Sequence, residues 1–160
     1  MKQKLYLDTS IPSSYYDTSK PIRQLITQKW FENEANMFDL FISVITIREI
    51  NKIKNISKRE NIEKIIIEYD MKLLDFSEEA NNLAEEYIRN GAIPETEPED
   101  AYHIAIATVN KIESLASWNF RHIVSINPIR KVHEINNKKG YGLIEISSLD
   151  LYGGYKYGNI

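Results

Sequence analysis

Short apolar segments alternate with longer segments of helical spacing along most of the chain, and this alternation constrains the fold most strongly. The apolar segments predict strands at residues 4–8, 39–45, 72–76, 113–118 and 143–146. The segments between them predict helices at residues 21–36, 46–53, 57–69, 77–90, 98–111 and 131–137. Strands that alternate with helices form a mostly parallel central sheet with helices on both faces. The sequence therefore predicts an α/β protein.

This fold class also predicts where a ligand site would lie. Right-handed crossovers place the carboxyl ends of all parallel strands at one edge of the sheet. Ligands of open α/β sheets bind outside that edge. Polar residues that directly follow the predicted strands are therefore the first candidates for function.

Length and composition limit the number of domains and the compartment. A chain of 160 residues fits one domain, which we place at residues 1–150, followed by a Tyr- and Gly-rich tail at 151–160. No cysteine is present, which excludes disulfides, thiolate metal sites and cysteine nucleophiles. No apolar run approaches the ~18 residues that span a bilayer. We therefore expect no membrane contact and a cytoplasmic location.

Charge and glycine distribution exclude two common ways of binding nucleic acids and nucleotides. The formal net charge is -3, whereas proteins that bind nucleic acid by charge alone carry a basic excess. Five of the six glycines lie at or beyond position 140, so the first strand-to-helix turn contains none. Rossmann and P-loop motifs need glycines at that turn, and both are therefore excluded.

Two carboxylates follow the first two predicted strands. Asp8 ends the first strand, where a turn-forming or helix-capping role is the alternative to a site. Glu49 follows the second strand. With Thr46 it matches the capping-box pattern, although Ser43 could equally cap this helix and leave Glu49 free.

Asp100 and Asn119 complete the set at the same predicted edge. Asp100 lies near the start of the most apolar helix and shares a face with His103, which we interpret as a core histidine. Burying an ionised carboxylate costs several kcal/mol unless it is paired or bound to a metal. Pairing with His103 or with the helix dipole is the structural alternative. Asn119 ends the fourth strand, and its amide oxygen can bind a hard cation or simply form a turn.

Together these four residues form an oxygen-only set of ligands. Mg²⁺ and Mn²⁺ prefer such ligands and keep several waters that substrate phosphates can replace. A bound cation would also supply the positive potential that the chain lacks. We therefore predict Asp8, Glu49 and Asp100 as metal ligands, and the same residues with Asn119 as the catalytic set.

Four short motifs carry a resemblance to a known family. They are Leu5-Tyr-Leu-Asp-Thr-Ser10, Ser43-Val-Ile-Thr-Ile-Arg-Glu-Ile50, Glu99-Asp-Ala-Tyr-His-Ile-Ala-Ile-Ala107 and Ser114-Leu-Ala-Ser-Trp-Asn-Phe-Arg-His122. Through them, residues 4–147 resemble the PIN-domain ribonucleases, and especially the VapC-like toxins of type II toxin–antitoxin systems. The resemblance implies a three-layer α/β/α sandwich and a metal-dependent endoribonuclease that hydrolyses RNA phosphodiester bonds. It also implies a homodimer that a cognate antitoxin binds.

The resemblance also assigns residue roles. Asp8, Glu49 and Asp100 fall on the family's three acidic positions, and Asn119 falls where many members have a fourth Asp. Thr9 would be the hydroxyl that orients the first Asp. Arg121 and His122 lie just past the fourth strand and are candidates for RNA contact.

The sequence argues against two other functions and leaves one alternative open. A receiver-like phosphoacceptor needs an acidic pair near the first strand, and residues 1–7 contain no Asp or Glu. A haloacid-dehalogenase-type phosphatase needs Asp-x-Asp, whereas the chain has Asp8-Thr-Ser10. The serious alternative is a PIN-like RNA- or protein-binding module with a weakened or inactive metal site. Asn119 and the acidic net charge both favour it.

Overall fold

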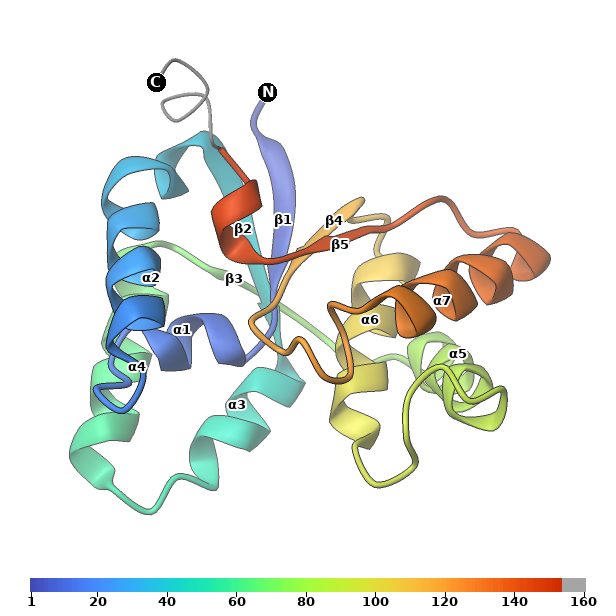
Figure 1. Ribbon diagram of the computed structural model, residues 1–160, viewed down its shortest axis with the longest axis horizontal. Coiled ribbons are helices and arrows are strands. Elements are labelled where there is room, and N and C mark those ends of the chain that lie inside the picture. Colours follow the sequence, from blue (N-terminus) through green and yellow to red (C-terminus); the bar gives the residue numbers. More distant parts are fainter. Residues whose placement is uncertain (154–160) are drawn as a thin grey trace.

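A single parallel sheet organises the part of the chain that the structure, a computed structural model, describes, residues 1–153. Its five strands run in the order β3-β2-β1-β4-β5, and every neighbouring pair is parallel (Figure 1). The strands are β1 (Gln3–Leu7), β2 (Phe38–Ser43), β3 (Lys72–Leu74), β4 (Ser114–Ala116) and β5 (Glu145–Ser147). The predicted sheet is confirmed, and β1 lies at its centre.

Helices cover both faces of this sheet. One group is α1 (Ser10–Ser14), α2 (Pro21–Asn33) and α4 (Ile56–Glu68); the other is α5 (Glu78–Arg89), α6 (Pro98–Val109) and α7 (Ile126–Lys139). The two groups lie on opposite sides of the sheet in Figure 1. Helix α3 (Val44–Asn51) follows β2 directly at the lower end. The three-layer α/β/α sandwich is therefore confirmed.

The side chains of β1 point alternately to the two faces of the sheet, so this strand contributes to both hydrophobic clusters. Leu5 and Leu7 pack into a cluster with residues of α1, α2 and α4. Tyr6, between them, points to the opposite face and packs with residues of α5, α6 and α7. Successive side chains of a strand point to opposite faces, so a strand buried on both sides has no exposed side chain in this stretch.

Helix α6 is the most deeply buried helix, as its sequence predicts. Pro98 occupies the first turn, where its missing N–H is tolerated. Seven of its twelve residues are buried, including His103. A helix that is apolar around most of its circumference belongs inside a fold. The consequence is that the first turn of α6 carries Asp100 toward the carboxyl edge of the sheet.

Three local features differ from the prediction. The turn after the first strand contains the short helix α1. Helix α7 begins at Ile126, five residues before the predicted start, because Pro128 is tolerated in a first helical turn. The segment assigned to the tail begins inside the fold, since Leu149–Leu151 form a 3-10 helix and Tyr152 is buried. The rest of the predicted tail, residues 154–160, lies outside the described residues.

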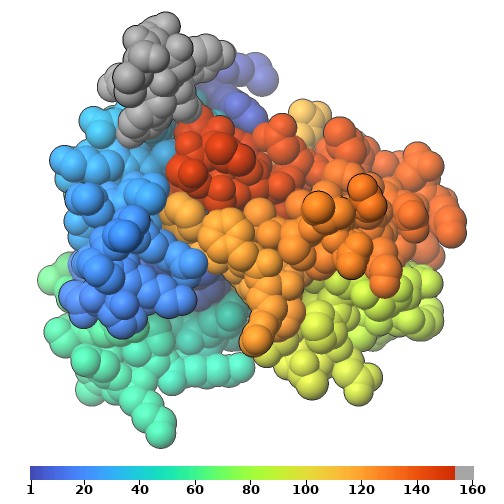
Figure 2. Space-filling view, in the orientation of Figure 1, coloured from blue at the N-terminus to red at the C-terminus, as the bar shows by residue number. Residues whose placement is uncertain are grey.

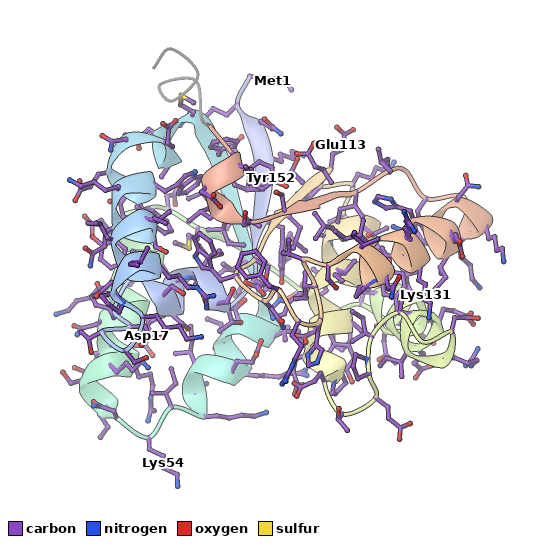
Figure 3. All side chains as sticks on the ribbon, in the orientation of Figure 1. Met1, Asp17, Lys54, Glu113, Lys131 and Tyr152 are labelled. Atoms are coloured by element: carbon purple, nitrogen blue, oxygen red, sulfur yellow. The ribbon has the colours of Figure 1, made fainter. Side chains whose placement is uncertain are left out.

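The two ends of the strands lie at opposite sides of the molecule. Lys54, just after α3, lies at the lower side in Figure 3, whereas Met1 and Glu113 lie toward the upper side. The lower side is therefore the carboxyl edge, where the candidate site was expected. Within residues 1–153, none of the helices has the length and apolar character needed to cross a lipid bilayer.

Candidate active site

Neighbouring strands bring the four predicted site residues to one edge. Asp8 directly follows β1, Glu49 lies in the second turn of α3, and Asp100 lies in the first turn of α6. Asn119 follows β4 by three residues. Because β2, β1 and β4 are adjacent in the sheet, these segments meet. Figure 2 shows a hollow where α3, the start of α6 and the segment after β4 come together.

Asp8 is buried and held by two serines. Its Oδ1 atom accepts hydrogen bonds from the backbone N–H (3.1 Å) and the hydroxyl of Ser10, and its Oδ2 atom accepts one from Ser117 Oγ at 2.6 Å. Burial raises the pKa of Asp8, while the charge of His103 and the two serine hydroxyls oppose that rise. The carboxylate is therefore fixed in position, but burial disfavours its ionised form when no cation is bound.

Glu49 is held from two other elements. Its Oε1 atom accepts hydrogen bonds from Thr9 Oγ1 at 2.8 Å and from His103 Nε2 at 2.6 Å. Burial alone would raise the pKa of Glu49, but the hydrogen bond and charge of His103 outweigh it, and the pKa is lowered. Glu49 is therefore an ionised carboxylate at neutral pH.

The cap of α3 leaves Glu49 free for this role. Ser43 is the capping residue, and Thr46 completes the capping box: Ser43 Oγ accepts from the Ile45 N–H, and the Ser43 N–H donates to Thr46 Oγ1. The alternative in which Glu49 itself closes a box with Thr46 does not occur. Helix α3 begins two residues earlier than predicted, so Glu49 lies in the second turn and points to the site.

Thr9 has a different partner from the one expected. The resemblance implies that its hydroxyl orients Asp8, but that hydroxyl donates to Glu49. Ser10 holds Asp8 instead, because the short helix α1 begins at that residue and turns its hydroxyl back toward the strand end. The sequence motif Asp-Thr-Ser thus supports two carboxylates with two successive hydroxyls.

His103 is the centre of a buried polar network that sequence reasoning missed. Its Nε2 atom contacts Glu49, and its Nδ1 atom lies 2.6 Å from the hydroxyl of Tyr6, which donates to Ser43 Oγ at 2.8 Å. Burial lowers the pKa of His103, but the hydrogen bond and charge of Glu49 outweigh it and the pKa is raised. His103 therefore pairs with Glu49 and not with Asp100. The sequence signal for this network was Tyr6, because a tyrosine in a strand that is buried on both faces needs a hydrogen-bond partner for its hydroxyl.

Asp100 is held by residues of the segment after β4. Its Oδ2 atom accepts a hydrogen bond from Asn119 Nδ2 at 3.1 Å and lies 3.3 Å from His122 Nδ1. Burial, and then the charge of Asp8, raise the pKa of Asp100 to about 6. The repulsion from Asp8 shows that these two carboxylates share one electrostatic environment, as two ligands of one cation would.

Asn119 contacts the site through its amide nitrogen. Its side-chain oxygen, which the sequence suggested as a ligand, accepts hydrogen bonds from the backbone N–H groups of Arg121 (3.2 Å) and His122 (2.9 Å). Asn119 thus shapes the turn and orients Asp100 at the same time. Arg121 is exposed, whereas His122 lies against Asp100.

Two carboxylates of the site keep an oxygen atom that could bind a hard divalent cation. Glu49 and Asp100 each use one carboxylate oxygen in the hydrogen bonds above, and within residues 1–153 the other oxygen of each takes no hydrogen bond from the protein. The oxygens of Asp8, Glu49 and Asp100 do not all lie within 4.8 Å of one another, but the potential ligand atoms of Glu97, Asp100 and His122 do. Glu97, which is not among the residues predicted for the site, therefore adds a further carboxylate beside Asp100.

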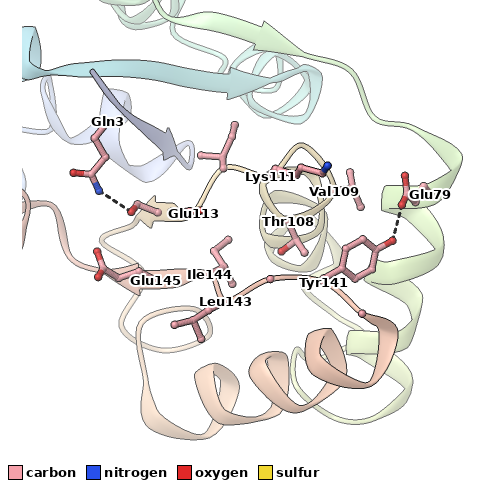
Figure 4. A pocket seen from close by; sticks show the side chains of 14 residues that line it. Gln3, Glu79, Thr108, Val109, Lys111, Glu113, Tyr141, Leu143, Ile144 and Glu145 are labelled. Atoms are coloured by element: carbon pink, nitrogen blue, oxygen red, sulfur yellow. Dashed lines mark hydrogen bonds between the residues drawn. The ribbon is translucent and has the colours of Figure 1, made fainter. Parts of the chain in front are cut away.

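A second hollow lies at the opposite end of the strands and has different chemistry. This cavity of about 730 Å³ is lined by residues at the starts of β1, β4 and β5 and by Tyr141, whose hydroxyl donates to Glu79 at 2.7 Å (Figure 4). Three glutamates, Glu79, Glu113 and Glu145, face one lysine, Lys111. This balance disfavours a phosphate-bearing ligand, so the carboxyl edge remains the candidate site.

Comparison with known proteins now defines the family. The family model of the PIN domain matches residues 5–121, nearly three quarters of the chain. The matched range includes Asp8, Glu49, Asp100 and Asn119. The chain therefore belongs to the PIN-domain family. Among curated proteins, no sequence has a significant match to this chain.

Solved structures agree on the fold. The chain is similar to VapBC2 from Rickettsia felis, bound to a DNA fragment from its promoter, with 18% identity and a TM-score of 0.56 over 89% of this chain and 98% of that chain. It is also similar to VapC20 of Mycobacterium tuberculosis, a toxin that cleaves the sarcin–ricin loop. Identity there is 13% and the TM-score 0.58, over 74% of this chain and 92% of that one. At these identities the likeness supports the fold.

Proposed function

We propose that this protein is a metal-dependent endoribonuclease that hydrolyses RNA phosphodiester bonds, and that it is the toxin of a toxin–antitoxin module. One observation supports the proposal: three carboxylates from three separate segments lie at the carboxyl edge of the sheet, in a chain of the PIN-domain family. The two similar structures, a toxin–antitoxin complex and an RNA-cleaving toxin, support the biological role.

In this proposal, Asp8, Glu49 and Asp100 hold Mg²⁺ or Mn²⁺. The cation would activate a water and stabilise the negative charge that develops on the phosphate oxygens. The protein supplies the positions: two serines fix Asp8, His103 and Thr9 fix Glu49, and Asn119 fixes Asp100. A ligand orientation set by such hydrogen bonds is worth about 10- to 100-fold in affinity or activity.

The charge of the site also suits the substrate. Burial, and then the charge of Asp8, raise the pKa of Asp100, and a bound cation would relieve the repulsion between the two carboxylates. Arg121 is exposed beside the site and His122 lies at its edge, where a phosphate of the RNA strand would pass. Both are proposed contacts to RNA.

Partners follow from the same proposal. We propose that a cognate antitoxin binds this chain, because the similar Rickettsia felis structure is a toxin–antitoxin complex. We also propose that the chain forms a homodimer, which light scattering after size-exclusion chromatography would measure. A monomer at all concentrations would contradict the proposed homodimer but not the proposed nuclease activity.

The test is a cleavage assay on a panel of structured RNAs that includes a sarcin–ricin loop hairpin. We expect cleavage with Mg²⁺ or Mn²⁺, none in EDTA, and a loss of at least ~100-fold in Asp8→Asn, because that change removes one ligand charge and little volume.

Asp17→Asn is the matched control. Asp17-Thr-Ser19 repeats the Asp-Thr-Ser motif, with the same contacts from the N–H and hydroxyl of its serine, but Asp17 is only half-buried, whereas Asp8 is buried. RNA binding without cleavage under any cation would instead support the binding module with an inactive metal site. Full activity of Asp8→Asn would contradict the metal mechanism.

A further inference from the structure

Phe120 is an exposed aromatic ring at the rim of the candidate site. It directly follows Asn119, and 51% of its surface is exposed. Its backbone is held in a tight turn, since its N–H donates to the carbonyl of Trp118 at 3.1 Å. The side-chain oxygen of Asn119 fixes the next two N–H groups. The ring is therefore presented to solvent from a rigid support.

Arg23, in the first turns of α2, lies beside this ring. Its guanidinium carbon is 5.5 Å from the centroid of the Trp118 ring and 5.8 Å from that of Phe120. The same part of α2 is tied to the segment after β4, because Trp118 Nε1 donates to Thr27 Oγ1 at 3.0 Å. The start of α2 and the segment after β4 lie side by side on the face shown in Figure 2.

In the described part of the chain, no carboxylate neutralises Arg23. Within residues 1–153, no Asp or Glu oxygen lies within 4.0 Å of its guanidinium, whereas Arg89 has such a partner in Glu86. Two aromatic rings hold the cation in place instead, by attraction to their faces. A fixed guanidinium without a protein anion is suited to bind a phosphate.

We propose that Phe120 and Arg23 bind the RNA strand beside the cleavage site, with Phe120 stacked on an unpaired base and Arg23 in contact with a neighbouring phosphate. The proposal rests on the proposed nuclease function and extends it, because it makes the substrate single-stranded at this position. Single-stranded RNA is recognised by stacking of splayed bases on aromatic rings and by contacts to arginine. A base here would adjoin Asn119, which touches Asp100.

Charge favours RNA over a protein partner at this pair. A protein that covered Phe120 would also bury Arg23, and it would have to provide its own carboxylate there. RNA brings a phosphate with every nucleotide and an aromatic base beside it. Ile22, on the same helix, is also exposed, so apolar docking of a protein is the outcome that the test must separate.

The experiment measures RNA binding apart from cleavage. Binding of a fluorescein-labelled single-stranded 12-nucleotide RNA of mixed sequence is followed by anisotropy in EDTA, with every variant built on Asp8→Asn. We expect Phe120→Ala and Phe120→Leu to weaken binding by about 5- to 100-fold, the range produced by loss of one base–aromatic stack. Phe120→Tyr should stay within about 2-fold. Arg23→Gln should reduce the dependence of log Kd on log salt by about one.

Two exposed residues away from this pair serve as controls. Leu143→Ala, at the other end of the strands, and Arg130→Gln, on α7, should leave RNA binding unchanged. Equal binding by Phe120→Ala and its parent, or full retention by Phe120→Leu, would overturn the proposal; the latter result would indicate an apolar contact. No measurable binding by the parent would overturn it as well. Cleavage by the wild-type chain is scored separately, so the nuclease and the stacking site can fail independently.

Discussion

Each carboxylate of the site, buried Asp8 and half-buried Glu49 and Asp100, is held by a donor from another part of the chain. Ser117, which follows β4, donates to Asp8. His103 on α6 donates to Glu49, and Asn119 donates to Asp100. A charged group inside a protein is tolerated only when such partners or a metal offset the cost of removing it from water. Each of the three carboxylates therefore has hydrogen-bond donors that offset part of the cost of keeping its charge away from water.

His103 gives the first prediction at this scale. His103→Ala removes one of the two hydrogen-bond partners of the Tyr6 hydroxyl and of Glu49 Oε1, together with a buried ring. This loss should lower the free energy of unfolding by about 2–4 kcal/mol. It should also weaken Mn²⁺ binding by about 10- to 100-fold, because Glu49 loses its orientation. Urea denaturation and calorimetric titration measure the two effects.

His133→Ala is the matched control for that change. His133 makes one hydrogen bond, from Nε2 to the carbonyl of Ile144 at 2.8 Å, and lies away from the carboxylates. It should cost about 1 kcal/mol of stability and leave Mn²⁺ affinity unchanged. Equal Mn²⁺ affinity in His103→Ala and the wild type would mean that His103 only fills the core.

Asn119 gives a prediction in which two measurements move in opposite directions. In Asn119→Asp, a carboxylate replaces the amide that donates to Asp100. Without a cation the two like charges repel, so the protein should lose about 1–2 kcal/mol of stability. With Mn²⁺ the added charge should raise affinity, because ligand charge tunes the binding of hard cations.

Calorimetric titration of Mn²⁺ into both proteins decides this point. Asn137→Asp, at an exposed position near the end of α7, is the control for adding a negative charge to the chain. If Asn119→Asp binds Mn²⁺ with wild-type affinity, Asn119 belongs to the turn and to the orientation of Asp100, and not to the ligand set.

The sequence predicted the place of the carboxylates better than their partners. Asp8, Glu49 and Asp100 could be placed at one edge because strand ends and helix starts are local features. The network around His103 could not, since it joins Tyr6, Ser43 and Glu49 from three elements that only the fold brings together. For the same reason, the sequence did not predict that Thr9 contacts Glu49 and that Ser10 contacts Asp8.

At the scale of elements, local signals predicted the long helices and missed what closes the core. Helix α6 starts at its proline as expected. Helix α7 is twice as long as the predicted 131–137 and is capped by Gly140, whose φ of 81° a residue with a side chain rarely adopts. Leu151 and Tyr152 are the first described residues of the predicted tail, because they continue no helical or strand period. Tertiary contacts give them structure: Trp30 Nε1 donates to the carbonyl of Tyr152 at 2.9 Å.

Tyr152 gives the prediction at this scale. Its ring packs in the cluster shared with Trp30 and Phe38, and its hydroxyl donates to the carbonyl of Leu115 at 3.1 Å. Tyr152→Ala should lower the free energy of unfolding by about 3–5 kcal/mol, as removal of a buried aromatic ring does. Tyr152→Phe, which removes only the hydrogen bond, should cost about 1 kcal/mol. Urea denaturation that shows no loss for Tyr152→Ala would mean that this segment is not part of the folded unit.

At the scale of the whole molecule, the parallel topology gathers negative charge at one end. The chain carries a net charge of -3, and the carboxyl edge holds buried carboxylates whose ionisation the fold opposes. A group whose pKa is raised by folding stabilises the folded state below its ordinary pKa, and this contribution is lost as the pH rises through the folded value. For Asp100 that interval runs from about 4 to about 6. The metal-free protein should therefore lose stability across it.

Asp100→Asn tests this global effect, because it removes the charge while keeping an oxygen for the Asn119 donor. In EDTA at pH 8, the variant should be more stable than the wild type by about 2–3 kcal/mol, since each pH unit between the two pKa values is worth ~1.4 kcal/mol. At pH 4 the difference should nearly disappear, because Asp100 is then protonated in the folded state and about half protonated in the unfolded state. With saturating Mg²⁺ the order should reverse, since a cation that binds only the folded wild type stabilises it.

Thermal unfolding at both pH values measures these differences, with the exposed Asp75→Asn as a control that should show none of them. If Asp100→Asn were less stable than the wild type in EDTA at pH 8, the buried charge would be structural, and the three carboxylates would need no cation to hold them together.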